Sequence, residues 1–161
     1  DNMTQQLGAL AALLDIEAGQ SELAAFYAQW AHDRLVIDKW FALQVSFATP
    51  AHTAQITETL THHKDFDWTN PNRFRAVFGA LAGNAAGFHD ASGASYRLLA
   101  DWLLRLDPLN PQTAARMSGA FETWARYDAG RQALIRAELA RIKATPALSR
   151  DLAEMVGRML G

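Results

Sequence analysis

The stretch Asn70-Pro71-Asn72-Arg73-Phe74-Arg75 opens with a residue pair that is typical of the start of a helix. An Asn at the N-cap accepts a hydrogen bond from a backbone N–H that has no partner within the helix, and a Pro at the next position needs no N–H. The pair returns forty residues later in Asn110-Pro111-Gln112-Thr113-Ala114-Ala115-Arg116. Helical-repeat proteins use units of roughly 34 to 47 residues, so this spacing favours stacked helical hairpins.

The remainder of the chain carries the same helical signal. Apolar residues recur at helical spacing through almost all of it, and no alternating strand pattern is present. We therefore predict an all-α fold of stacked antiparallel helical hairpins, an armadillo- or HEAT-like α-superhelix, in which residues 1–161 form a single domain. About nine helices are expected, over residues 4–17, 21–30, 35–47, 50–63, 71–81, 95–106, 111–124, 128–142 and 149–160, with a turn at 84–89.

One predicted helix, over residues 35–47, differs from the others because it is apolar on most sides. Such a helix is usually central in its domain. It nevertheless carries Asp38, and a charge on a buried helix must be paired or must line a cavity. We expect a structural ion pair rather than a cavity. Asp128 and Ser149 are expected to cap the last two helices.

Composition excludes several classes of function. A formal net charge of −2 over 161 residues provides no basic surface for nucleic acid. Without cysteine the chain forms no disulfide and no thiolate metal site, which fits a cytoplasmic location. No apolar stretch reaches the roughly 18 residues of a membrane span, so no membrane partner is expected.

The histidines and the serine of one loop do not form a recognisable catalytic or metal motif. No H-E-x-x-H spacing is present, and the adjacent His62 and His63 point about 100° apart on a helix, which is unsuitable for one ion. Ser92 follows His89 and Asp90 closely, but closeness in sequence is not the geometry of a catalytic triad. We expect a polar turn there, with no metal or catalytic residue in the chain.

Three arginines are the best candidates for function. Arg73 and Arg75 flank an apolar stripe on opposite sides of the first Asn-Pro helix, and Arg116 lies at the edge of the stripe of the second. Guanidinium groups near the starts of two helices suit an anion-attracting wall. The alternative is ion pairing between helices with the many Asp and Glu residues, and the pattern alone favours this alternative.

Six segments of the chain form a recognisable set, namely 1–4, 36–44, 70–75, 88–89, 110–116 and 126–132. Together they resemble the C-terminal part of bacterial aminopeptidase N, a family of zinc metallo-aminopeptidases. The similarity follows the same order over nearly the whole chain. It departs before Tyr96, where the family tends to have Asp-Gly-x-Gly-Tyr and this chain has Ser92-Gly93-Ala94-Ser95-Tyr96, so the role of that Asp does not carry over.

The resemblance implies a non-catalytic cap domain, a C-terminal fragment of a larger enzyme that releases N-terminal residues from peptides. Family members hold zinc through an H-E-x-x-H pair and a downstream Glu, and bind the peptide amine through Gly-x-Met-Glu-Asn; neither motif lies in this chain. The implied partners are therefore the zinc-bearing catalytic domain of the same parent chain and peptide substrates. Arg75 and Arg116, and less so Arg73, would face the substrate chamber and attract acidic groups or the peptide carboxylate.

Two other hypotheses remain from the sequence. The first alternative to the cap is a free-standing helical-repeat module whose concave side binds another protein. An independent enzyme using Ser92 or His89 is the least favoured. If the chain is a cap, we expect an apolar docking face near its first two helices and self-association of the isolated fragment, because large apolar patches tend to be covered.

Overall fold

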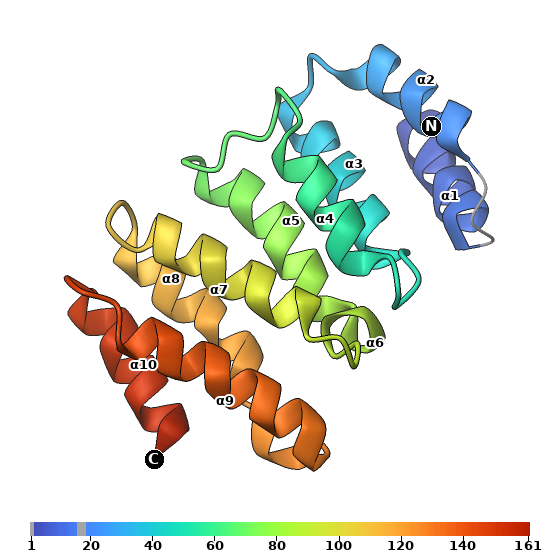
Figure 1. Cartoon of the computed structure of the whole chain (residues 1–161). Helices are drawn as coiled ribbons and strands as arrows, with labels where there is room; N and C mark the ends of the chain where they lie inside the picture. Colours follow the sequence, from blue (N-terminus) through green and yellow to red (C-terminus); the bar gives the residue numbers. More distant parts are fainter. Residues whose placement is uncertain (1, 16–18) are drawn as a thin grey trace. The chain divides into compact units, whose positions relative to one another are not determined.

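The computed structural model describes residues 2–15 and 19–161, and every regular element within them is a helix (Figure 1). The all-α prediction is confirmed. No helix in these ranges is long and apolar enough to cross a membrane. The ten α-helices and two 3₁₀-helices are α1 (Asn2–Asp15), α2 (Gln20–Trp30), α3 (Arg34–Ser46), α4 (Thr53–Thr61), α5 (Pro71–Gly83), α6 (Ala85–Phe88), α7 (Ala94–Leu106), α8 (Pro111–Ser118), η1 (Gly119–Phe121), η2 (Trp124–Arg126), α9 (Ala129–Lys143) and α10 (Arg150–Leu160).

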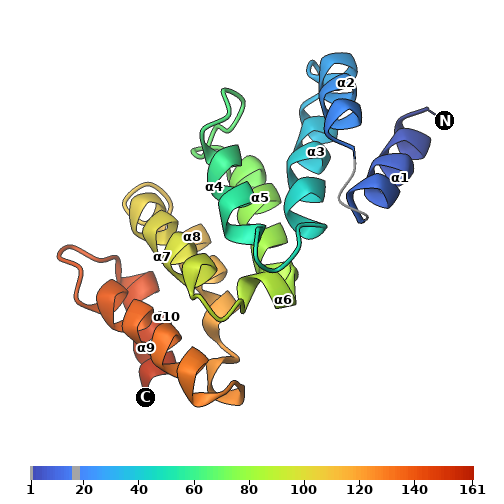
Figure 2. The same ribbon diagram turned by 45° about the vertical axis from the view of Figure 1, so that its right-hand side comes forward.

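The chain forms two compact units, residues 1–87 and 88–161. In the first unit α3 contacts α1, α2, α4 and α5, and its contact with α5 is the most extensive. Both ribbon views show α4 and α5 side by side (Figures 1 and 2). The predicted central position of this helix is confirmed. The two apolar residues at the ends of the predicted range depart from the expectation, because Leu35 is 71% exposed and Phe47, which follows α3, is 37% exposed.

The core of the first unit is an aromatic and aliphatic layer between α3 and α5. The predicted apolar stripe of α5 is fully buried, and the rings of Phe74 and Phe78 stack 4.8 Å apart. Full burial of such a side chain contributes about 1.5–3 kcal/mol. The residues that α3 and α5 bury here are Val36, Ile37, Trp40, Phe41, Val45, Phe74, Val77, Phe78 and Leu81.

In the second unit α7 packs on α8 and α9, and α10 packs on the same two helices. Figure 2 shows the α9–α10 pair with its connecting loop. The amphipathic patterns predicted from the sequence supply this core. Its fully buried side chains include Tyr96, Leu99, Leu103, Phe121, Ile135, Leu139, Ile142, Leu152 and Val156.

The predicted helix caps are confirmed. At each position the side-chain oxygen accepts a backbone N–H within the first turn, which satisfies a donor that the helix leaves unpaired. The four bonds run to Asn70 from Asn72 (3.0 Å), to Asn110 from Thr113 (3.1 Å), to Asp128 from Arg131 (3.1 Å) and to Ser149 from Leu152 (3.1 Å).

Two predicted helices have other boundaries in the structure. The helix expected at 50–63 begins only at Thr53, because the His52 N–H closes a turn on the Thr49 carbonyl at 2.9 Å. The helix expected at 111–124 ends at Ser118 and continues as 3₁₀ turns. Ser118 is buried and its hydroxyl donates to the Ala115 carbonyl at 2.6 Å, which competes with the helical ladder, and Gly119 follows. The expected end of the first helix at Glu17 lies outside the described residues.

The segment expected to be a turn at 84–89 contains the short helix α6. Asn84 accepts the Gly87 N–H at 3.1 Å and so acts as its cap. A Cβ atom on Gly87 would lie 2.1 Å from the Thr53 hydroxyl oxygen, so this close approach of α6 to α4 requires glycine.

Candidate functional site

Arg73, the first candidate arginine, lies in the first turn of α5 with its side chain buried. Its Nε donates to the Asp38 carboxylate on α3, and a terminal nitrogen donates to the backbone carbonyl of Asp65. The guanidinium carbon lies 5.1 Å from the centre of the Phe41 ring, a cation–π contact. The structural ion pair predicted for Asp38 is therefore confirmed, and Arg73 is its cation.

An aromatic cage adjoins this ion pair. The His63 ring lies 5.0, 5.3 and 5.4 Å from the ring centres of Tyr27, Trp40 and Phe41. Its Nδ1 accepts the Asp65 N–H at 3.0 Å, and burial lowers the pKa of His63. The Tyr27 hydroxyl donates to the Asp65 carboxylate, which raises the pKa of Tyr27. The cage thus packs α2 and α3 against the segment that follows α4.

The other two arginines keep donors available. Arg75 is half-buried on α5 and donates to the Asn72 side-chain oxygen at 2.6 Å. Arg116 is exposed and makes no hydrogen bond or ion pair with any residue that the structure describes. The expectation that Arg116 lies near a positive helix start is wrong, because α8 ends at Ser118 and Arg116 lies in its last turn.

The structure thus separates the three candidates. Arg73 and Arg75 share α5 and point to different surroundings, as the helical period predicts: one is buried in an ion pair and the other is half-buried. Arg116 belongs to the second unit. Arg75 and Arg116 are the two candidates whose guanidinium groups can bind a ligand without breaking an internal ion pair.

A second polar cluster lies within residues 88–161. His89 Nδ1 lies 2.7 Å from the Tyr96 hydroxyl oxygen, and the His89 ring stacks on Tyr127 with 3.8 Å between centres. Arg131 Nε donates to the His89 carbonyl at 2.5 Å. Burial lowers the pKa of His89 and raises the pKa of Tyr96 to about 12, so both side chains are neutral at pH 7.

The loop after His89 is a polar turn, as predicted. The Ser92 hydroxyl donates to the Asp90 carboxylate at 2.6 Å and accepts the Ala94 N–H at 3.2 Å, while the His89 ring bonds to Tyr96. A serine nucleophile needs a general base within hydrogen-bond reach. Here the hydroxyl faces a carboxylate that caps the turn.

No three His, Cys, Asp or Glu side chains within 2–15 and 19–161 are grouped so that they could hold a metal ion. The adjacent histidines illustrate the reason. His62 is exposed after the last turn of α4, and His63 lies in the aromatic cage with Nδ1 already bonded. The two adjacent rings therefore lie in different environments, one in solvent and one in the aromatic cage.

These features define an all-helical repeat domain. A family model described as a domain of unknown function (DUF3458_C) of ARM repeats matches residues 1–161. The chain belongs to this family of ARM-repeat domains.

Relatives of this chain are larger enzymes, of which the matching domain forms one part. The chain is 41% identical to aminopeptidase N of Caulobacter vibrioides, 41% identical to aminopeptidase N of Haemophilus influenzae and 36% identical to that of Escherichia coli. Each alignment covers 99% of this chain and 19% of the relative. The chain thus spans about a fifth of their length and corresponds to the C-terminal part of aminopeptidase N-like enzymes.

The chain is also similar in fold to a solved structure. It is aminopeptidase A of Legionella pneumophila in complex with aspartic acid, with a TM-score of 0.86 and 28% sequence identity. The similarity covers 99% of this chain and 20% of that one.

Proposed function

We propose that this chain is the non-catalytic C-terminal cap of a cytoplasmic zinc aminopeptidase N. The cap lines the chamber through which peptides reach the active site and controls their access. The parent enzyme releases N-terminal residues from peptides. Identity of 41% to two bacterial aminopeptidases N, over 99% of this chain, carries the proposal.

In this proposal the zinc ligands lie in the catalytic domain of the parent chain. Within the described part of the cap, no cluster of potential ligands is available to the metal. The contribution of the cap is instead to bind and orient the part of the peptide that the catalytic domain does not hold.

Arg75 and Arg116 are the side chains that we assign to peptide binding. A guanidinium group presents a planar fork of donors that matches a carboxylate. Among the described residues Arg116 has no hydrogen-bond or ion-pair partner, and the hydrogen bond of Arg75 in that set goes to the neutral side chain of Asn72. Arg73 positions Arg75 indirectly, because its bonds to Asp38 and Asp65 anchor the first turn of α5.

The test uses the full-length enzyme and three substrates: an aminoacyl anilide, a long peptide with a free carboxylate and the same peptide with an amidated C-terminus. Arg75→Ala or Arg116→Ala is expected to lower kcat/KM for the carboxylate peptide about tenfold to a hundredfold, since a charge-assisted bond contributes roughly 1.5–3 kcal/mol. The anilide and the amidated peptide should be nearly unaffected.

Conservative variants provide the control. Arg75→Lys and Arg116→Lys keep the charge and lose the fork, so they should fall between the wild type and the Ala variants. Equal losses on all three substrates would mean that the arginines are structural. Hydrolysis of the anilide by residues 1–161 alone, with stoichiometric zinc, would contradict the proposed function itself.

A further inference from the structure

An open groove lies in the first unit where α2 and α4 both pack on α3. Its volume is about 320 Å³, which lies within the range of roughly 300–1,000 Å³ that is usual for ligand sites. Its floor is apolar, because the lining residues Leu23 and Leu60 are only 4% and 5% exposed. The residues that line the groove are Gln20, Leu23, Gln44, His52, Gln55, Ile56, Thr59 and Leu60.

The groove is held in shape by the unit itself. The Trp40 indole N–H donates to the Leu23 carbonyl at 2.9 Å and so ties α3 to α2 at the floor. The Gln44 side-chain nitrogen donates to the Trp40 carbonyl at 3.1 Å, which fixes this amide at the edge of the groove. The Gln44 side-chain oxygen accepts no hydrogen bond from a described residue and remains available as an acceptor.

Two further amides lie at the edge of the groove, Gln20 on α2 and Gln55 on α4. Both side chains are exposed, and neither makes a hydrogen bond with any residue that the structure describes. A primary amide offers two donors and one acceptor oxygen, which are the partners that the C=O and N–H groups of a peptide bond need. We call Gln20, Gln44 and Gln55 the amide rim.

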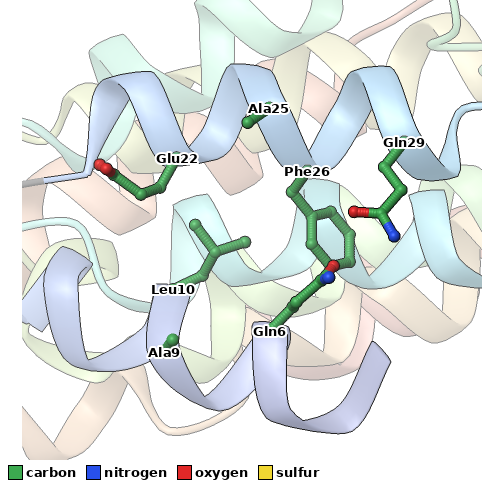
Figure 3. Close-up of a pocket in the computed structure, with 7 residues that line it drawn as sticks. All are labelled: Gln6, Ala9, Leu10, Glu22, Ala25, Phe26 and Gln29. Atoms are coloured by element: carbon green, nitrogen blue, oxygen red, sulfur yellow. The ribbon is translucent and has the colours of Figure 1, made fainter. Parts of the chain in front are cut away.

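The lining of this groove carries no fixed charge. Within the described part of the chain no Asp, Glu, Lys or Arg lines it, although these four residue types make up 20% of the sequence. The groove between α1 and α2 differs, because Glu22 lines it together with Gln6 and Gln29 (Figure 3). A charged group that enters a site without a counter-charge loses hydration without compensation. The lining therefore favours an uncharged ligand.

We propose that this groove binds an uncharged segment of an extended peptide through the peptide main chain. The amide rim pairs with the C=O and N–H groups of the segment, and the apolar floor receives its side chains. Because successive side chains of an extended chain point to opposite faces, every second side chain of the peptide meets the floor. Neither Arg75 nor Arg116 lines this groove. The inference rests on the proposed function in one respect, namely that the cap binds peptides.

Calorimetric titration of the full-length enzyme tests the proposal with a peptide that is not a substrate. The probe is acetyl-Ser-Leu-Ser-Leu-Ser-amide, which has leucines at every second position. Its blocked ends lack the free amine of a substrate and the carboxylate that we assign to Arg75 and Arg116. The wild-type enzyme is expected to bind this probe, and absence of binding would overturn the proposal.

Variants of the amide rim locate the binding. Gln20→Leu and Gln55→Leu each remove one amide from an exposed position. Each is expected to weaken binding about threefold to tenfold, as for the loss of a hydrogen bond between neutral groups, and the double variant at least tenfold. Gln29→Leu is the matched control, because Gln29 lies on the same helix as Gln20 and lines the other groove (Figure 3). Equal affinity of the double variant and the control would contradict the assignment.

Modified probes test the chemistry of binding on the wild-type enzyme, independently of how the variants fold. The peptide with every amide nitrogen methylated keeps its side chains and loses its main-chain donors, so it should bind at least tenfold more weakly. The peptide with Asp in place of both leucines should also bind at least tenfold more weakly, since the groove offers no counter-charge. Undiminished binding of either peptide would sink the proposed mode of recognition.

Peptidase activity on the same samples separates this inference from the proposed function. An enzyme that releases N-terminal residues, but whose rim variants bind the probe as the wild type does, contradicts this inference alone. A full-length protein that binds the probe through the amide rim, but releases no N-terminal residues from peptides, contradicts the proposed function alone.

Discussion

The helices α5 and α8 begin alike and end differently. Each has Asn at its N-cap and Pro at its first position, and the two cap bonds measure 3.0 and 3.1 Å. However, α5 continues for 13 residues with a fully buried apolar stripe, whereas α8 stops after eight at a buried serine. Their arginines differ in the same way. Arg73 is enclosed in an ion pair, and Arg116 is exposed.

The comparison shows that residues close in sequence determine where a helix starts, whereas packing against distant parts of the fold determines how far it continues. An Asn-Pro pair satisfies and removes backbone donors in the first turn wherever it occurs. Whether the next turns persist depends on what the rest of the fold packs against them. Substitutions in the stripes, the arginines and the caps, and a change of pH, should affect stability in this order, from the largest effect to the smallest.

The largest difference in stability loss is expected between the apolar stripes of α5 and α8. Phe78→Ala, in the fully buried stripe of α5, is expected to lower the free energy of unfolding by about 4 kcal/mol, because it leaves a cavity beside Phe74. Met117→Ala on α8 should cost about 1 kcal/mol, since Met117 is only half-buried. Urea unfolding followed by circular dichroism measures both. Similar losses would show that α8 is packed as tightly as α5.

The second largest difference in stability loss is expected between Arg73 and Arg116. Arg73→Met is expected to cost about 3 kcal/mol, because it leaves the Asp38 carboxylate, 20% exposed, without its cation. Arg116→Met should change the free energy of unfolding by less than about 0.5 kcal/mol. Adding Asp38→Leu to Arg73→Met should recover part of the loss, since no unpaired charge then remains. Failure of that double variant to recover would mean that packing on Phe41, not the ion pair, is what Arg73 provides.

The two Asn caps should contribute equally to stability. Asn70→Ala and Asn110→Ala are each expected to cost about 1 kcal/mol, because each removes one bond to a backbone N–H in the first turn. Asp at either position should retain most of the stability. Thermal unfolding of the four variants gives the comparison. A much larger loss at one Asn than at the other would contradict the local origin of helix starts.

The pH response should be small and shared by the two units. Burial lowers the pKa of His63 in one unit and of His89 in the other. The unfolded chain, with a His pKa near 6.5, then binds protons first, so the stabilisation is present above pH of about 6.5 and is lost as pH falls through the lowered pKa. Between pH 7 and pH 5 each histidine is expected to contribute less than about 1 kcal/mol, because both side chains are only half-buried.

The urea midpoint between pH 7 and pH 5 measures this effect. His63→Phe and His89→Phe should each flatten the decline, and the double variant should flatten it further. An unchanged slope in either variant would assign the acid sensitivity to other groups.

The candidate site was predictable in part. The opposite placement of Arg73 and Arg75, and the ion pair of Asp38, follow from helical spacing and from the cost of burying a charge. The cage around His63 was not predictable, because Tyr27 and Asp65 are 38 residues apart and carry no local signal. The position of Arg116 near a helix end was missed for a related reason: the break at Ser118 depends on a buried side-chain bond.

The amino-acid sequence by itself determined the all-helical class, the helix starts and the faces that enter the core. These depend on capping bonds and apolar spacing, which act over one or two turns. Only the tertiary structure decided where α8 stops, why Gly87 must be glycine and which arginine is enclosed. Those outcomes depend on atoms from distant segments meeting within a few ångströms, and no local pattern specifies such a meeting.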